Sequence, residues 1–220
     1  MALRYKKITV KVGSNVLTKN DGMLNVARIA HLVEQISVLH KAGVELVLVS
    51  SGAVASGKGV LMPSKKTDAV SSRQLWSALG QVKLMSRYSD FFREYDMVCA
   101  QVLTTKENFS SRAHYLNMKN CINTLLENGV VPVVNENDTI SVTELMFTDN
   151  DELSGLMATL ANSEALIILT NVDGVYDGNP DDPFSKVITE IGNGKDEGQI
   201  SVSDERSEFG RGGIITKLRI

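Results

Sequence analysis

The sequence has few of the residues that mark disulfide-rich or metal-binding proteins. It contains only two cysteines, Cys99 and Cys121, which form neither a disulfide framework nor a metal-binding spacing. We therefore expect both to pack as small apolar side chains. The three histidines lie far apart on helical patterns, so nothing pairs them as ligands and we predict no metal site built from protein side chains.

The sequence also lacks a charge imbalance and a long apolar run. Its formal net charge is -3, which leaves no basic excess to neutralise the phosphates of nucleic acids or anionic lipids. No stretch approaches the roughly 18 apolar residues that span a bilayer, and the apolar run after the basic start is too short for a signal peptide. We expect a cytoplasmic protein without nucleic-acid or membrane partners.

Short apolar strands and amphipathic helices alternate along the 220 residues, of which 43% are hydrophobic. Strands are predicted at residues 8–12, 44–50, 97–103, 130–134 and 165–170, and helices at 26–42, 74–95, 112–128 and 151–161. This alternation favours a parallel sheet covered on both faces. Pro132 cannot donate to a sheet ladder, so its strand is expected at an edge or irregular position, whereas the strand at 165–170 is expected to be buried.

Polar or glycine-rich residues follow four of these strands. The segments are VKVGSN (10–15), VSSGA (49–53), VNEND (134–138) and LTNVDG (169–174). Any one of them alone is more typical of a generic turn. Because ligands bind beyond the carboxyl ends of parallel strands, the four together predict a binding site at that edge of the sheet.

Two of these segments carry charged side chains that are suited to binding or catalysis. Lys11 interrupts an apolar strand and projects to the face opposite Val10 and Val12; the alternative is an edge lysine that points to solvent. In the segment NEND, the carboxylate of Asp138 suits the ammonium group of a zwitterionic ligand, and the neighbouring asparagine amides suit its carboxylate. The alternative is an Asx-turn with solvated side chains.

The stretch SSGAVASGKG (50–59) matches the G-x-x-x-x-G-K spacing of a phosphate-binding P-loop. A P-loop, however, needs Ser or Thr after its lysine to hold magnesium, and here Gly59 follows Lys58. The stretch also follows the second strand, whereas P-loops usually follow the first. We therefore disfavour a P-loop nucleotidase and expect Lys58 to be solvated, one to two helical turns from the site.

Taken together, the motifs resemble the amino acid kinase family, and within it the branch that phosphorylates the side chain of glutamate. The matching segments, which occur in the family's order and span nearly the whole chain, are VKVGSNVLT, VLVSSGAVASG, LTTKENF, VVPVVNENDT, TDNDELSGLMA, ILTNVDGVYDGNP and GRGGIITKL. The combination of NEND, DND and GG-x-x-TK separates this branch from the carbamate, acetylglutamate, uridylate and aspartate kinases.

The resemblance implies an α/β fold, a three-layer αβα sandwich with a mainly parallel central sheet. It implies a single domain over residues 1–220, with a substrate lobe at about 1–160 and an incomplete nucleotide lobe at about 161–220, whose last part is missing, and no additional C-terminal domain. The implied reaction is ATP-dependent phosphorylation of the γ-carboxylate of L-glutamate to L-glutamyl 5-phosphate, the first step of proline biosynthesis. The alternatives are a related carboxylate substrate such as N-acetylglutamate, or a non-catalytic sensor.

The resemblance also implies roles for individual residues. The catalytic set is Lys11, Asp151 and Lys217, in which Asp151 positions the two lysines. The glutamate-binding set is Ser51, Gly52, Asp138 and Asn150. The nucleotide-binding set is Lys11, Gly13, Thr170, Asn171, Arg211, Gly212, Gly213, Ile214, Ile215, Thr216 and Lys217. Two of these depart from the family pattern, because Asn171 stands where Asp is usual and Arg211 where a small hydroxylated residue is common.

Elementary chemistry is consistent with this reaction. A glutamate side chain titrates near pH ~4.3, so it is an ionised nucleophile at neutral pH and needs no general base. Catalysis then consists mostly of positioning and charge neutralisation, for which two lysines and magnesium suffice. The implied cofactors are ATP and Mg2+, with magnesium bridging the phosphates. The implied partners are glutamate, proline as feedback inhibitor, glutamyl phosphate reductase in the pathway, and further copies of the chain in a homo-oligomer.

Overall fold

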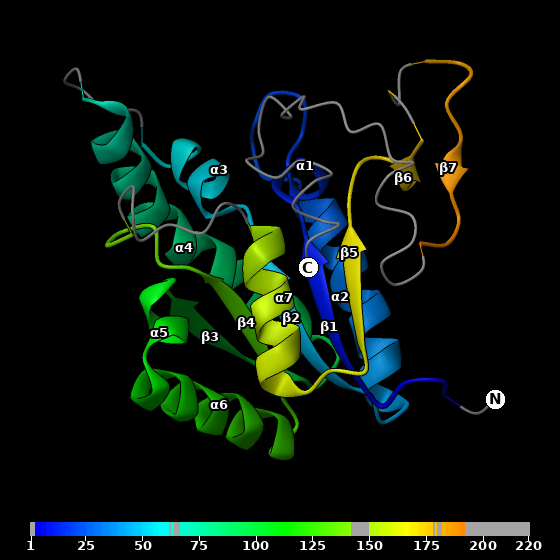
Figure 1. Ribbon diagram of the computed structural model, residues 1–220. Coiled ribbons are helices and arrows are strands. Elements are labelled where there is room, and N and C mark those ends of the chain that lie inside the picture. Colours follow the sequence, from blue (N-terminus) through cyan, green and yellow to red (C-terminus); the bar gives the residue numbers. More distant parts are fainter. Residues whose placement is uncertain are drawn as a thin grey trace.

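A computed structural model describes residues 3–61, 63, 67–141, 150–177, 179 and 182–191 (Figure 1). Its main sheet has five parallel strands in the order β3-β4-β2-β1-β5. The strands are β1 (Lys7–Val12), β2 (Glu45–Ser50), β3 (Val98–Thr104), β4 (Val130–Glu136) and β5 (Ala165–Leu169). A separate antiparallel pair is formed by β6 (Val175–Tyr176) and β7 (Val187–Ile188).

Helices connect the parallel strands and cover both faces of the sheet. They are α1 (Ser14–Leu17), α2 (Val26–Lys41), α3 (Ala53–Lys58), α4 (Ala69–Arg93), α5 (Glu107–Ser110), α6 (Arg112–Glu127) and α7 (Asn150–Ala161). Helices α2 and α4 pack on one face, and α6 and α7 on the other (Figure 1). The predicted three-layer αβα architecture with a parallel central sheet is therefore confirmed.

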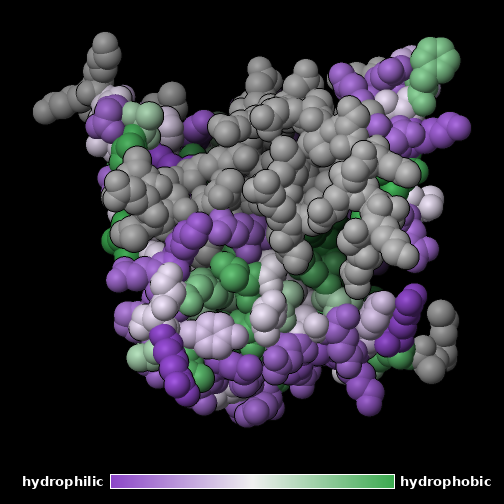
Figure 2. All heavy atoms as spheres, in the orientation of Figure 1, coloured by the Kyte–Doolittle hydropathy of each residue, from purple (hydrophilic) through white to green (hydrophobic). Residues whose placement is uncertain are grey.

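The two-residue period of β1 assigns its side chains to two different cores. Ile8, Val10 and Val12 join the core beneath α2 and α4. Thr9 and Lys11 consequently face the second core, which α6 and α7 form with Val47 and Val49 of β2. On the solvent side of α6, the surface in Figure 2 is mainly hydrophilic, while its apolar face buries residues of the second core.

The predicted strands and helices are confirmed, with corrections at three places. Helix α4 begins at Ala69 rather than at residue 74, because the Asp68 side chain caps it by accepting from the Ser71 N–H at 2.9 Å. The edge position expected from Pro132 is wrong, since β4 lies between β3 and β2. The sheet tolerates this proline because the β2–β4 ladder begins only at Val133, where it pairs with Leu48.

The third correction concerns β5, which was expected to be buried. In the described part of the chain it is the edge strand beyond β1, and its residues are half-buried, with Ile167 41% exposed.

The prediction that both cysteines pack as apolar side chains holds only for Cys99, because Cys121 is exposed. Burial raises the pKa of the Cys99 thiol to about 11. Among the described residues, no helix is long and apolar enough to span a membrane.

Helices α3 and α4 approach each other so closely that only glycine fits at their contact. A Cβ atom on Gly57 would lie 1.8 Å from the backbone oxygen of Trp76, and one on Gly80 would lie 1.8 Å from that of Ala53. Such distances are far below van der Waals contact, so a larger residue must push the helices apart. The second glycine of the P-loop-like stretch is therefore required for helix packing.

We predict that Gly57→Ala destabilises the protein by about 1–3 kcal/mol, because the added methyl group meets backbone that cannot move aside locally. Urea unfolding followed by circular dichroism measures this change. Gly59→Ala is the matched control. Gly59 has φ -76°, which alanine adopts freely. Its Cβ would lie 3.1 Å from Sδ of the flexible Met23 side chain and no closer than 3.5 Å to any backbone atom outside its chain neighbours. Equal unfolding midpoints for the two variants would contradict the packing argument.

Candidate functional site

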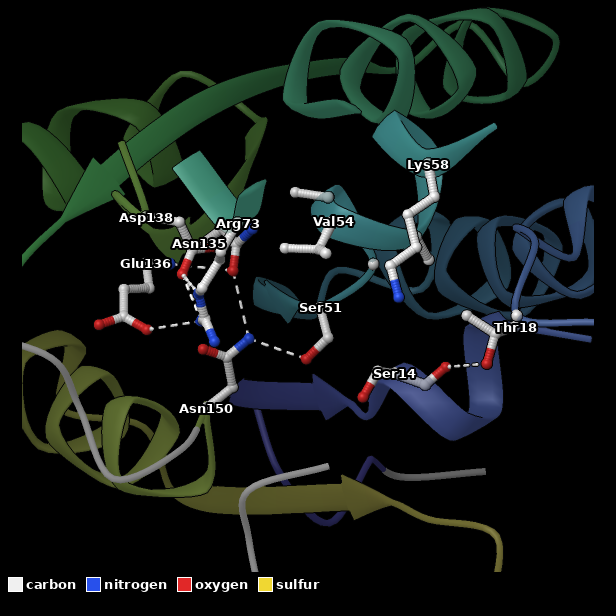
Figure 3. Close-up of a pocket in the computed structure, with 14 residues that line it drawn as sticks. Ser14, Thr18, Ser51, Val54, Lys58, Arg73, Asn135, Glu136, Asp138 and Asn150 are labelled. Carbon is white, nitrogen blue, oxygen red and sulfur yellow. Dashed lines mark hydrogen bonds and ion pairs between the residues drawn. The ribbon is translucent and has the colours of Figure 1, made fainter. Parts of the chain in front are cut away.

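A cavity of about 210 Å³, lined mainly by residues with polar side chains, lies at the carboxyl ends of β1, β2 and β4 (Figure 3). Parallel pairing brings these strand ends to one edge of the sheet, as the sequence predicted. The cavity is lined by Ser14, Thr18, Gly22, Ser51, Gly52, Ala53, Val54, Ala55, Lys58, Arg73, Asn135, Glu136, Asp138 and Asn150. A larger groove of about 430 Å³ between α2 and β5 is almost wholly apolar, so the polar chemistry gathers in the first cavity.

Lys11 lies in the interior of the sheet. Its strand pairs with β2 on one side and β5 on the other, and Lys11 is only 8% exposed. Its Nζ forms an ion pair with Oδ1 of Asp151, in the first turn of α7, and the Asp151 side chain is 2% exposed. The alternative of a solvated edge lysine is therefore wrong.

Gly13 adjoins this ion pair at the end of β1. A Cβ atom at Gly13 would lie 3.4 Å from the Lys11 Nζ, so the glycine leaves space beside the ammonium group. Its own N–H donates to the Leu169 carbonyl at 3.3 Å. Because Val12 pairs with Leu169 in the sheet, Thr170 follows next to Gly13 at the same edge.

A chain of polar side chains crosses the cavity from β2 to β4. The Asn150 Nδ2 donates to Ser51 Oγ at 2.8 Å and to Asn135 Oδ1 at 3.2 Å. Asn135 in turn donates through its Nδ2 to Gln81 Oε1 at 3.1 Å, and its Oδ1 also accepts from the Glu136 N–H. The network fixes Ser51 and Asn150 next to each other, two residues that sequence reasoning had grouped as substrate ligands.

The end of the cavity next to this network carries three charged side chains, Arg73, Glu136 and Asp138, which we call the carboxylate end (Figure 3). The Arg73 guanidinium donates from Nε to Asp138 Oδ1 at 2.9 Å and also from Nη2 to the same oxygen. Its Nη2 lies 3.6 Å from Glu136 Oε2. Burial raises the pKa of Asp138 above its usual range, and Arg73 opposes part of that rise.

Sequence reasoning missed Arg73 and assigned no role to Glu136. Arg73 stands 65 residues before Asp138, and an arginine in a helix normally implies a solvated surface. Glu136 belongs to the NEND segment, but only the structure shows that its side chain is 4% exposed and faces the same cavity as Asp138.

The P-loop interpretation is excluded by the local structure. Gly52, with φ +103°, ends the loop after β2, and helix α3 starts at Ala53. Lys58 is therefore the last residue of α3, whereas a P-loop lysine stands at the start of the helix that follows the loop. Lys58 is exposed, as expected, and its Nζ lies 5.1 Å from the centre of the Trp76 ring. It nevertheless lines the cavity, at the end away from Asp138 (Figure 3). The expectation that Lys58 is remote from the site is therefore wrong.

The predicted nucleotide residues are only partly described. Thr170 is half-buried and Asn171 exposed at the end of β5. Residues 211–217, including Lys217, lie outside the described residues, so their assignment stays a prediction. No group of three or more His, Cys, Asp or Glu side chains with metal-binding geometry occurs among the described residues.

Comparison with known proteins matches the chain to one family over nearly its whole length. The profile of the amino acid kinase family covers residues 6–220. Glutamate 5-kinase of Bacteroides thetaiotaomicron is 59% identical over 220 residues, which are 100% of this chain and 61% of that protein. The Chlorobaculum tepidum and Clostridium acetobutylicum glutamate 5-kinases are 46% and 39% identical, cover 98% and 97% of this chain, and are themselves covered to 59% and 80%.

The chain thus spans about three fifths of the length of the first two of these relatives. Among solved structures, UMP kinase from Bacillus anthracis superimposes with a TM-score of 0.54 at 18% identity, covering 83% of this chain and 72% of that one. At this identity the similarity shows the fold alone.

We predict that Asp151→Ala destabilises the protein by about 3–5 kcal/mol, because it leaves the Lys11 ammonium buried without its partner. The double variant Lys11→Met, Asp151→Leu should regain most of this loss, since it removes both charges and keeps the volume filled. Both are measured by chemical denaturation at neutral pH.

Glu152→Ala, one residue further along α7, is the matched control. Glu152 pairs with Lys106 at 2.9 Å, and the two side chains are 26% and 46% exposed, so its loss should cost less than about 1 kcal/mol. If Asp151→Ala were no more destabilising than this control, the buried pair would not hold α7 on the sheet.

Proposed function

The chain belongs to the amino acid kinase family, and we propose that it transfers the γ-phosphoryl group of ATP to the γ-carboxylate of L-glutamate. The product is L-glutamyl 5-phosphate. The observation that carries the proposal is the order of polar groups from the cavity to the end of β1. Asp138 lies at one end of the cavity, and Ser51 and Asn150 lie next to each other in its wall. The Lys11–Asp151 pair does not line the cavity, but Asp151 directly follows Asn150 at the start of α7. This order matches the ammonium, α-carboxylate and reacting carboxylate of one glutamate molecule.

Each proposed contact follows from the chemistry of the group. The Asp138 carboxylate accepts from the α-ammonium of glutamate, and the Ser51 hydroxyl, which accepts from Asn150, donates to the α-carboxylate. Both N–H groups of Asn150 donate to Ser51 and Asn135, so Asn150 binds the α-carboxylate by turning one of them to the ligand. Gly52 leaves the backbone bare at the turn beside Ser51, where its φ of +103° strains any other residue. The names of the relatives, all glutamate 5-kinases, support the same substrate.

Phosphoryl transfer requires little covalent chemistry from the protein. The γ-carboxylate is ionised at neutral pH and attacks phosphorus directly; the new O–P bond forms as the bond to the β-phosphate oxygen of ATP breaks and ADP leaves. Lys11 neutralises the charge that redistributes over the phosphoryl oxygens. Asp151 fixes the Lys11 ammonium in place, and Gly13 leaves room for a phosphate beside it.

We propose that ATP is bound by the backbone near Gly13, by Thr170 and Asn171, and by residues 211–217. Among the last, Lys217 would stabilise charge on the nucleotide side. Asp151 is engaged with Lys11, and the described residues bring no three metal-ligating side chains together. We therefore propose that magnesium is held mainly by the ATP phosphates and water, where it neutralises phosphate charge.

The alternative substrate N-acetylglutamate fits the cavity less well. At the carboxylate end, the described contacts bring two buried carboxylates, Glu136 and Asp138, to the guanidinium of Arg73, and the carboxylate of Asp138 also faces the cavity, where it attracts a positive ligand group. An acylated amine is neutral and larger. A non-catalytic sensor is disfavoured because Lys11 and Asp151 stand as a buried pair at the reacting end.

The wider biological role is proposed from the family resemblance. It comprises the first step of proline biosynthesis in the cytoplasm, feedback inhibition by proline, a pathway link to glutamyl phosphate reductase and a homo-oligomeric assembly. The two-lobe division near residue 160 is proposed on the same basis.

The reaction is tested by trapping the acyl phosphate with hydroxylamine in the presence of ATP and magnesium. We predict hydroxamate formation with L-glutamate at a rate well above that with aspartate, N-acetylglutamate or carbamate. A reaction without ATP gives the background. Equal rates with glutamate and N-acetylglutamate would assign the protein to the acetylglutamate branch, and no product with any substrate would favour the sensor.

We also predict that Lys11→Ala lowers kcat for glutamate by about 10²–10³, since it removes a preorganised cation from the transferring group. Calorimetric affinities for glutamate and ATP should change less. Lys7→Ala is the control: Lys7 lies on the same strand but pairs with Glu45 at the other end of the sheet, at 2.8 Å. A Lys11→Ala enzyme with normal turnover would exclude Lys11 from catalysis.

A further inference from the structure

Arg73 occupies an unusual electrostatic position in the cavity. Its side chain is 31% exposed, whereas the carboxylates that it contacts, Asp138 and Glu136, are 7% and 4% exposed. Both guanidinium contacts to Asp138 converge on one oxygen, Oδ1. No described residue hydrogen-bonds to the second oxygen, Oδ2, and Asp138 lines the cavity.

The described charges around the cavity favour an ammonium group next to Asp138. At the carboxylate end, the buried carboxylates of Asp138 and Glu136 both contact the guanidinium of Arg73. The other described cation that lines the cavity, Lys58, lies at the end away from Asp138, over the Trp76 ring (Figure 3). A cationic group of a ligand is therefore best placed beside Asp138.

We propose that Arg73 is the positioning residue for recognition of the substrate's α-ammonium: it holds Oδ1 of Asp138 and thereby presents Oδ2 to the ligand. This inference rests on the proposed function, because it takes glutamate as the ligand. Arg73 itself does not contact the ammonium, since like charges repel. Its fork geometry matters, because two donors of one planar group converge on Oδ1 and fix the carboxylate plane.

The same geometry predicts how glutamate binding depends on pH. Burial raises the pKa of Asp138, and Arg73 is the group that opposes this rise; Glu136 from β4 and Lys58 from α3 are the other charged side chains of the cavity wall. Only ionised Asp138 attracts an ammonium, so binding is lost as the pH falls through its pKa. Without Arg73 the pKa rises further, and the loss of binding begins at a higher pH.

The experiment compares Arg73→Gln, Arg73→Lys and the unchanged protein by calorimetry with L-glutamate over a pH series. Arg73→Gln should weaken glutamate binding by about 10- to 100-fold. The pH at which glutamate binding is lost on acidification should rise, while ATP affinity and kcat at saturating glutamate change little. Arg73→Lys retains the charge but not the fork, so it should recover part of the affinity. Arg93→Gln is the control, since Arg93 lies on the same helix and pairs with exposed Asp90.

A second measurement works without any ligand. Carbon-13 NMR titration of the Asp138 carboxyl should give a higher pKa in Arg73→Gln than in the unchanged protein. Unchanged titration together with unchanged glutamate affinity overturns the role of Arg73 while leaving the proposed function intact. In another outcome, the pKa of Asp138 changes in Arg73→Gln but the unchanged protein binds no glutamate. That result would overturn both the proposed function and the assignment of an ammonium as the ligand of Oδ2.

Discussion

The site depends on one electrostatic constraint: a lysine ammonium inside a parallel sheet must have a buried counterion. Lys11 lies on an interior strand, where an unpaired charge would be strongly unfavourable. Asp151 supplies the counterion from the first turn of α7, which ties that helix to the end of β1. The helix then brings Asn150 to Ser51, so the position of the polar network follows from the ion pair.

Buried charges are arranged differently in the cavity and in the neighbouring ion pair. The ammonium of Lys11, which does not line the cavity, is matched by the carboxylate of Asp151. At the carboxylate end, Arg73 contacts the buried carboxylates of both Asp138 and Glu136. In the proposed function, the ammonium of glutamate therefore lies at the carboxylate end and its reacting carboxylate points toward Lys11.

Helices α3 and α4 form part of the cavity wall. Their close contact explains why the sequence carries a glycine spacing that resembles a P-loop. Gly57 and Gly80 allow the two helices to touch through their backbones, which places Arg73 of α4 over the cavity. The glycine spacing that resembles a P-loop thus arises from helix packing. Lys58, at the end of α3, is exposed and stacks on Trp76.

The sequence by itself determined the alternation of strands and helices, the face to which Lys11 points and the segments at the strand ends, because these depend on local periodicity. It did not determine the edge of the sheet: Pro132 suggested β4, but ladder pairing is set residue by residue between distant segments, and β2 joins β4 only from Val133 onward. Nor did it reveal Arg73, whose partner Asp138 lies 65 residues away. The burial of Glu136 and the cavity position of Lys58 likewise depend on packing between α3, α4 and β4, and no local sequence pattern encodes contacts between elements so far apart.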